Sequence, residues 1–158
     1  MAQTVRELMR ETIALAADNA RRGDGGPFAA LIVRKGEVIS TGVNRVTSEL
    51  DPTAHAEINA IRAACLHVGE FQLSGLDIYT SCEPCPMCLG AVYWARLDRI
   101  FYAATRGDAA EVGFDDDVIY REICVPIEMR RVPLEQVMRD EAREVLTEWY
   151  SMPGRKGY

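Results

Sequence analysis

The sequence predicts a layered α/β domain whose sheet has parallel pairing in its second half. In the second part of the chain, segments with the hydrophobic period of a helix alternate with short apolar runs, and strand–helix–strand units of this kind form parallel pairs. Earlier, two apolar runs flank the dipeptide Lys35-Gly36, a pattern typical of a β-hairpin. A length of 158 residues corresponds to one domain, expected here to span 1–158.

The first part of the chain predicts a helix, the hairpin and a polar loop. Apolar residues recur near helical spacing over Thr4–Arg22, and several glycines together with Pro27 end this helix. The hairpin strands are expected at Phe28–Arg34 and Glu37–Val43. The polar stretch Asn44–Thr53 is expected to be a loop.

The central part predicts two helices that alternate with two strands. Asp51 or Thr53 is the expected N-cap of the first helix, because short oxygen-bearing side chains satisfy free backbone N–H groups there. Pro84 and Pro86 open the second helix, where the missing proline N–H has no intrahelical partner. The expected order is helix, strand, helix, strand, at Ala54–Val68, Leu76–Ser81, Pro84–Arg96 and Arg99–Ala104.

The last third of the chain has a different character. Gly107–Asp117 is small and acidic, Val118–Cys124 is expected to form a short helix, and Pro126 ends it. A long amphipathic helix is expected over Leu134–Tyr150, followed by the polar tail Ser151–Tyr158.

Composition and charge disfavour several classes of function. The net charge is −6 and the pI is about 5.0, whereas a surface that binds nucleic acid is usually basic. No run of 18 apolar residues occurs, so no membrane span is expected. The charged N-terminal residues contain no signal-type apolar stretch, and five cysteines, an odd number, fit a reducing compartment. The expected location is the cytoplasm.

Two short motifs predict a catalytic metal site. The sequence contains His55-Ala56-Glu57 and Pro84-Cys85-Pro86-Met87-Cys88, which together form the H-x-E and P-C-x-x-C signature of zinc deaminases that act on nucleobases. One imidazole and two thiolates provide three zinc ligands, and a tetrahedral ion then keeps one position for water. The carboxylate of Glu57 is free to transfer protons during hydrolysis.

The positions of the motifs at two predicted helix starts strengthen the zinc prediction. Two helix N-termini directed at one point produce a positive local field, which favours thiolates at Cys85 and Cys88. The alternative is a structural zinc site, which usually has four protein ligands. Only Cys82 is an obvious candidate for a fourth ligand, and it is expected to be a buried thiol at the end of a strand.

The motifs and their surroundings resemble the cytidine-deaminase-like superfamily and, within it, the small zinc-dependent guanine deaminases of bacteria. The similarity extends over almost the whole chain. The central motifs are shared with tRNA adenosine deaminases, whereas Gly113–Asp116 and the terminal tyrosine point to the guanine enzymes. The stretches that carry the resemblance are Gly26-Pro27-Phe28, Asp51–Glu57, Thr80–Ala91, Asp108–Glu111, Gly113–Asp116 and Tyr158.

The resemblance implies a three-layer α/β/α fold with a mixed central sheet and one Zn²⁺ per subunit. His55, Cys85 and Cys88 would hold the zinc ion, and Glu57 would be the proton shuttle. The implied reaction is the hydrolysis of guanine, a small-molecule purine base, to xanthine and ammonia. It further implies a homodimer in which the segment from about residue 118 to residue 158 is exchanged between subunits.

The resemblance also implies roles for residues that would contact the base. Asn44 would hydrogen-bond the purine edge, and Asp116 would accept hydrogen bonds from the N–H donors of guanine. Phe28 would pack on the purine ring, and Tyr158 of the neighbouring subunit would close the pocket. Trp94 is a further candidate for the pocket lining.

Three alternatives remain open from the sequence. The first is a tRNA-specific adenosine deaminase, which would need a basic surface and a site open to an extruded base. The second is a deaminase of guanosine or of another aminopurine or aminotriazine, because a ribose requires only local space. The third is a zinc-stabilised interaction module, although such a module has no need of Glu57.

Overall fold

The computed structural model describes residues 2–158 and divides into two compact units. The first unit ends at Tyr120, and the second comprises Arg121–Tyr158. Each unit is described by itself below.

The first unit contains a four-stranded mixed sheet with the strand order β2-β1-β3-β4. β1 pairs antiparallel with both β2 and β3, while β3 pairs parallel with β4. The hairpin and the parallel pair are therefore confirmed, at positions close to those expected. The strands are β1 (Ala29–Arg34), β2 (Glu37–Val43), β3 (Asp77–Cys82) and β4 (Arg99–Ala104).

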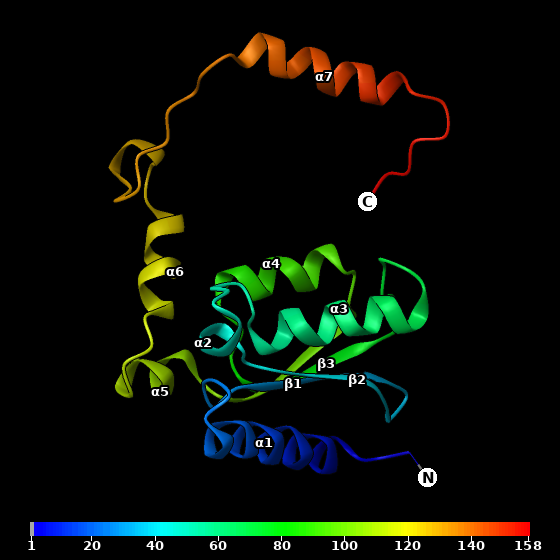
Figure 1. Cartoon of the computed structure of the whole chain (residues 1–158), viewed down its shortest axis with the longest axis vertical. Coiled ribbons are helices and arrows are strands. Elements are labelled where there is room, and N and C mark those ends of the chain that lie inside the picture. Colours follow the sequence, from blue (N-terminus) through cyan, green and yellow to red (C-terminus); the bar gives the residue numbers. More distant parts are fainter. Residues whose placement is uncertain (1) are drawn as a thin grey trace. The chain divides into compact units, whose positions relative to one another are not determined.

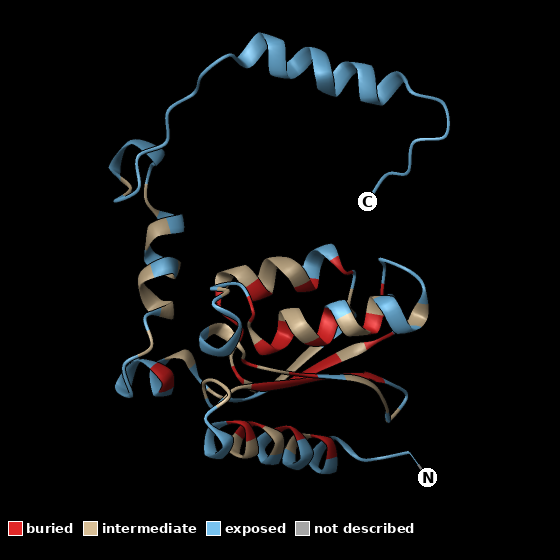
Figure 2. Cartoon of the chain, in the orientation of Figure 1, coloured by how far each residue is buried: buried red, intermediate tan, exposed pale blue. Residues whose placement is uncertain are grey.

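Helices cover both faces of this sheet, which confirms the three-layer α/β/α architecture (Figure 1). α1 (Val5–Arg22) lies against one face, and α3 (Ala56–Val68) and α4 (Pro86–Trp94) lie against the other. Alternate residues of the strands supply the two sides of the core. The buried residues of the first unit are red in Figure 2. Leu31 and Tyr79 pack toward α1, while Ile32 packs with the helices on the opposite face.

Helix starts differ from the sequence expectation in a way that matters for the site. α3 begins at Ala56 with His55 as its N-cap, so the prediction that Asp51 or Thr53 caps this helix is wrong. Asp51 instead accepts a 2.7 Å hydrogen bond from the backbone N–H of Thr53 and stabilises the turn before the helix. Because His55 is itself the N-cap, its side chain is held at the entrance of the helix.

Two short helices occupy segments that the sequence predicted to be irregular. α2 (Val46–Glu49) lies within the polar stretch after β2, and α5 (Arg106–Glu111) begins within two residues of the end of β4. α5 starts with a capping box in which the Thr105 side chain accepts from the N–H of Asp108. This box explains how a six-residue helix containing Gly107 can form.

The C-terminal helices also begin at positions different from those expected. α6 spans Asp116–Cys124, two residues longer at its start than predicted, and a 3₁₀ turn follows at Ile127–Met129. α7 spans Arg139–Ser151 rather than beginning at Leu134. Beyond Tyr120, the described residues include none that is buried (Figure 2). No helix among residues 2–158 combines the length and the apolar character that a membrane crossing requires.

Candidate metal and substrate site

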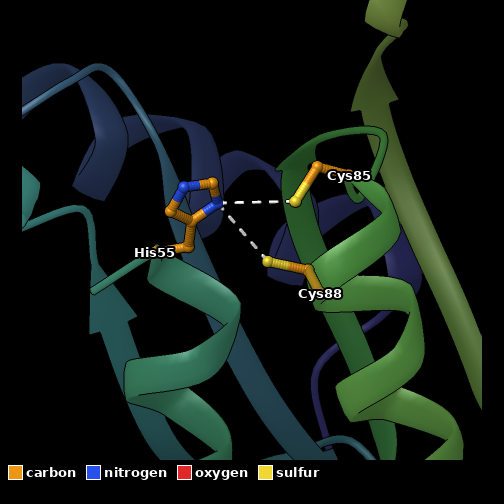
Figure 3. Close-up of side chains that lie close together, drawn as sticks. All are labelled: His55, Cys85 and Cys88. Atoms are coloured by element: carbon orange, nitrogen blue, oxygen red, sulfur yellow. Dashed lines mark hydrogen bonds between the residues drawn. The ribbon is translucent and has the colours of Figure 1, made fainter. Parts of the chain in front are cut away.

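His55, Cys85 and Cys88 converge on one point between the starts of α3 and α4 (Figure 3). The His55 Nδ1 atom lies 3.6 Å from the Cys85 Sγ and 3.5 Å from the Cys88 Sγ. All three donor atoms lie within 4.8 Å of one another. The structure thus brings together residues that are 30 and 33 positions apart in the sequence.

These separations fit zinc. Sulfur and nitrogen ligands at about 2.3 Å and about 2.0–2.1 Å from a tetrahedral ion lie about 3.6 Å from each other. The observed nitrogen–sulfur distances of 3.6 and 3.5 Å agree with this value. One imidazole and two sulfurs are also the donor types that zinc prefers. The three residues are therefore placed to hold a zinc ion with one position left for a non-protein ligand.

The helix starts explain why these side chains are available. His55 is the N-cap of α3 and Cys85 is the N-cap of α4, and both have the extended backbone of that position. Neither side chain makes the usual capping hydrogen bond to its helix. Pro86 at the first position of α4 removes one N–H that would otherwise need a partner. Both side chains therefore point to the metal position instead of to the helix backbone.

The sulfur atoms near the site have different properties. A hydrogen bond from Cys88 lowers the pKa of Cys85 to about 4, so Cys85 is a thiolate at neutral pH. Burial raises the pKa of Cys82 to about 11, and its sulfur lies 3.5 Å from the carbonyl oxygen of Thr105. Cys82 is outside the cluster of donor atoms. It is a buried neutral thiol, as expected, and the alternative of a fourth zinc ligand has no support.

Glu57 lies in the first turn of α3, two residues after His55, and only 8% of its surface is exposed. Burial raises its pKa to about 7. A carboxyl group with this pKa both takes up and releases a proton near neutral pH, as a general acid–base catalyst must. Glu57 is not one of the clustered metal donors.

A cavity of about 490 Å³ opens beside the metal position. Its volume lies in the range of small-molecule sites, which is about 300–1,000 Å³. Most of the residues predicted to act on a purine line this one cavity: Phe28, Asn44, His55, Glu57, Cys85 and Asp116. Cys88 is fully buried behind them.

Asn44 has one end of its side chain committed to the backbone. Its Oδ1 atom accepts hydrogen bonds from the N–H groups of Gly26 and Val46, at 3.2 and 3.3 Å. The side chain of Asn19, 1% exposed, donates to the carbonyl oxygens of both Gly26 and Asn44. A Cβ atom on Gly25 would lie 2.1 Å from the Asn44 carbonyl oxygen, so only glycine allows this close approach. Asn44 therefore offers its NH₂ group, a donor, to the cavity.

Two aromatic rings form one wall of the cavity. Phe28 and Phe114 meet edge to face, with ring centroids 4.7 Å apart and an interplanar angle of 78°. Sequence reasoning identified Phe28 but not Phe114, although both line the cavity. The signal available for Phe114 was its place beside Asp116 in an otherwise small and acidic stretch.

The three remaining predicted residues, Asp116, Trp94 and Tyr158, lie in different surroundings. Asp116 is the first residue of α6 and lines the cavity, and burial raises the pKa of its carboxyl group. Trp94 does not line this cavity and is 60% exposed. Tyr158 belongs to the second unit and is 74% exposed, so its predicted role stays a prediction.

The fold and the metal site define a class of zinc-dependent proteins. A family model described as the cytidine and deoxycytidylate deaminase zinc-binding region matches residues 2–104. The chain belongs to this deaminase family, which confirms the resemblance inferred from the motifs.

Two of the similar proteins, one compared by sequence and one by structure, are guanine deaminases. The chain is 49% identical to the guanine deaminase of Bacillus subtilis (strain 168) over 95% of its own length and 96% of that protein. The X-ray structure of guanine deaminase from Bacillus subtilis superposes with a TM-score of 0.95, at 47% identity and 99% coverage of both chains. The tRNA-specific adenosine deaminase of Agrobacterium fabrum is more distant, with 41% identity over 65% of this chain and 69% of that one.

Proposed function

We propose that this chain is a zinc-dependent hydrolase that converts guanine and water to xanthine and ammonia. The observation that carries the proposal is the single cavity in which the metal ligands and Glu57 lie beside a donor from Asn44 and a carboxylate from Asp116. The similarity to guanine deaminases over nearly the full chain supports the same substrate.

The polar groups of the cavity match the hydrogen-bonding pattern of guanine. Guanine has N–H donors at N1 and at its exocyclic amine, and the Asp116 carboxylate is an acceptor on the cavity wall. Ring nitrogens and the carbonyl oxygen of guanine are acceptors, and the free NH₂ group of Asn44 is a donor. A base with the reverse pattern would leave these polar groups unpaired, which penalises its binding.

The aromatic pair gives the base a surface to pack on. The rings of Phe28 and Phe114 lie at nearly a right angle, so one ring can stack on a flat purine while the other contacts its edge. This arrangement would fix the plane of the base, and the proposed reaction requires that C2, which bears the exocyclic amine, faces the metal ligands.

Glu57 has the position and the protonation behaviour for the proton transfers of the reaction. A zinc ion held by His55, Cys85 and Cys88 would supply Lewis acidity and so make a nucleophile available from water at neutral pH. The Glu57 carboxylate accepts the proton of the attacking water and delivers it to a ring nitrogen. It then takes a second proton from the hydroxyl group newly bound to C2 and transfers it to the amine. As the C2 carbonyl forms, the carbon–nitrogen bond breaks and ammonia leaves. Because Glu57 is buried, it exchanges these protons with the substrate rather than with bulk water.

The second unit is proposed to act within a homodimer. Its described residues include many exposed apolar side chains and none that is buried, a pattern that is stable only when another surface covers them. Exchange of this segment with an identical chain provides such a surface in both subunits. The terminal Tyr158 of one subunit is proposed to close the cavity of the other. The reduced cysteines and the acidic surface fit action in the cytoplasm on a free base rather than on nucleic acid.

Measurement of ammonia release across a substrate panel tests the proposed function. The panel contains guanine, guanosine, adenine, cytosine, cytidine and a tRNA with an adenosine in its anticodon. We expect release from guanine alone at a rate typical of enzymes, about 1–1,000 s⁻¹. Release from guanosine would identify a nucleoside deaminase, and release from the tRNA would identify the rival RNA function.

Replacement of Glu57 by glutamine separates the metal site from proton transfer. Glu57→Gln keeps the size of the side chain but cannot accept a proton, so turnover of guanine is expected to fall by at least about 100-fold. The zinc content measured by elemental analysis should stay near one ion per chain, because Glu57 is not among the metal donors. Glu70→Gln, at an exposed position, is the matched control. Undiminished turnover in Glu57→Gln would refute the mechanism.

A further inference from the structure

Tyr120, in the middle of α6, connects this helix with the segment that precedes the metal ligand Cys85. Its hydroxyl group donates a 2.7 Å hydrogen bond to the carbonyl oxygen of Pro84. Pro84 is buried and directly precedes Cys85, the N-cap of α4. Tyr120 thus contacts the backbone one residue away from a metal ligand, although it is neither a donor in the metal cluster nor part of the cavity lining.

Arg106 holds the ring of Tyr120 in this position. The guanidinium carbon of Arg106 lies 4.3 Å from the centroid of the Tyr120 ring, a cation–π contact. The backbone N–H of Arg106 donates a 3.1 Å hydrogen bond to the carboxylate of Glu83. Glu83 is bonded covalently to Pro84, so the contacts form a closed circuit through Glu83, Arg106, Tyr120 and Pro84.

The same helix carries Asp116. Residues four positions apart lie on one face of an α-helix, so Asp116 and Tyr120 project from the same side of α6 in successive turns. Asp116 lines the cavity, while Tyr120 is bound to the metal-ligand loop. The hydrogen bond to Pro84 therefore fixes the height and the rotation of the helix turn from which Asp116 reaches the cavity.

We propose that Tyr120 is a positioning residue that sets the location of Asp116 relative to the metal centre and thereby sets the affinity for guanine. Arg106 supports it by keeping the phenol ring aimed at Pro84. The proposal rests on the proposed function, because it takes Asp116 as the group that binds the base. It predicts that the Tyr120 hydroxyl contributes to substrate affinity without contact with the substrate.

Affinity for guanine in paired variants tests this proposal. Tyr120→Phe keeps the ring under Arg106 and removes only the hydrogen bond to Pro84. The dissociation constant of radiolabelled guanine is measured by equilibrium dialysis in the Glu57→Gln background, where turnover does not consume the ligand. We expect Tyr120→Phe to raise the dissociation constant by roughly five- to tenfold, the effect of one lost hydrogen bond. When Asp116→Ala is already present, the same change should alter it by less than about twofold.

Kinetics and controls distinguish positioning from general stability. With Glu57 intact, Tyr120→Phe should raise KM by the same factor while kcat changes by less than about twofold and zinc content is unchanged. Arg106→Gln should act in the same direction, and Tyr102→Phe, on the exposed side of β4, should have no effect. The proposal would be overturned if Tyr120→Phe raised the dissociation constant of guanine by the same factor with and without Asp116. It would also be overturned if Tyr120→Phe left this dissociation constant unchanged. Absence of guanine binding in the Glu57→Gln parent would instead contradict the proposed function, on which the role of Tyr120 depends.

Discussion

Asn44 uses one end of its side chain to hold the backbone and keeps the other for the cavity. Its oxygen is satisfied by two N–H groups, so the amide orientation is set before any ligand arrives. From the sequence alone, an asparagine side chain could offer a ligand either a donor or an acceptor. In the structure, only the NH₂ donor is left for a ligand. The donor that Asn44 presents therefore depends on Gly26 and Val46 as much as on Asn44 itself.

Substitution of Asp116 is expected to reduce activity far more than stability. Asp116→Ala removes the acceptor for guanine, and kcat/KM should fall roughly 30- to 200-fold, which corresponds to about 2–3 kcal/mol. The free energy of unfolding should change by less than about 0.5 kcal/mol, because the residue is half-buried at a helix start. Asp115→Ala, next to it but exposed, is the matched control and should leave kcat/KM unaltered. Equal losses of activity and of stability would show that Asp116 is structural.

The sequence predicted the metal donors better than the cavity wall. His55, Cys85 and Cys88 follow from local spacing, because each motif sets its side chains at one helix start. Phe114 and Tyr120 belong to no such helix-start motif, and the signal for Phe114 was only its place near Asp116. Their roles come from contacts with residues that are distant in the sequence. Phe28 is 86 positions from Phe114, and Pro84 is 36 positions from Tyr120. These contacts are visible only in the folded chain.

The helices of the first unit start in two different ways. α1 and α5 begin with capping boxes, at Thr4 and Thr105, that satisfy their first N–H groups within the helix. α3 and α4 begin with His55 and Cys85, whose side chains make no capping hydrogen bond. Ordinary caps thus stabilise α1 and α5, and the uncapped starts of α3 and α4 supply the metal ligands.

The contact between β2 and α3 predicts an intolerance of any side chain at Gly42. A Cβ atom there would lie 2.2 Å from the carbonyl oxygen of Ala56 and 2.4 Å from the backbone nitrogen of Ala60. Gly42→Ala is expected to lower the free energy of unfolding by about 2–3 kcal/mol, because backbone atoms on both sides must move. Gly107→Ala, in α5 with ordinary contact distances, is the matched control and should be neutral or stabilising by up to about 1 kcal/mol. Chemical denaturation measures both, and a neutral Gly42→Ala would contradict the close packing.

The sequence located elements with a clear hydrophobic period more accurately than the others. The strands and α1 have clear hydrophobic periods and were predicted to within a residue or two. α5 was missed because Arg106–Glu111 is only six residues long and includes a glycine, and its one local signal was the pair Thr105 and Asp108. The start of α7 was placed too early because Leu134 and Val137 continue the apolar pattern without being helical.

The whole molecule contrasts a well-packed first unit with a second unit that has no core of its own. On α7, Val145, Leu146 and Trp149 are 64%, 68% and 41% exposed. A helix with such a face rarely remains uncovered in water. The exposed apolar face of α7 is the structural reason to propose a dimer in which this segment is exchanged between subunits.

A mixing experiment tests both the exchange and the role of Tyr158. Deletion of Tyr158 should slow guanine turnover with little loss of stability, since the residue is exposed at the chain end. In an exchanged dimer, a heterodimer of the deletion variant and Glu57→Gln has one site with both Glu57 and Tyr158 intact. Unfolding and refolding the two variants together should therefore restore roughly a quarter of wild-type activity, by statistical assortment.

Two results would contradict this assembly. A fully active deletion variant would show that Tyr158 does not close the cavity. An activity of the mixture no greater than the sum of the separate variants would show that each active site is built from a single chain. The variants Glu57→Gln and Tyr158-deleted, each refolded alone, are the controls.

The division of labour between helix starts and cavity wall has a consequence for how new specificities arise. The reactive centre depends on α3 and α4, whereas the groups proposed to face the base come from the chain before β1, the end of β2 and the entrance to α6. Mutations in these outer segments are expected to change the recognised heterocycle while the metal ligands and Glu57 stay unaltered. A directed-evolution library limited to Phe28, Phe114 and Asp116 thus explores new amino-substituted rings with the reactive centre unchanged in sequence.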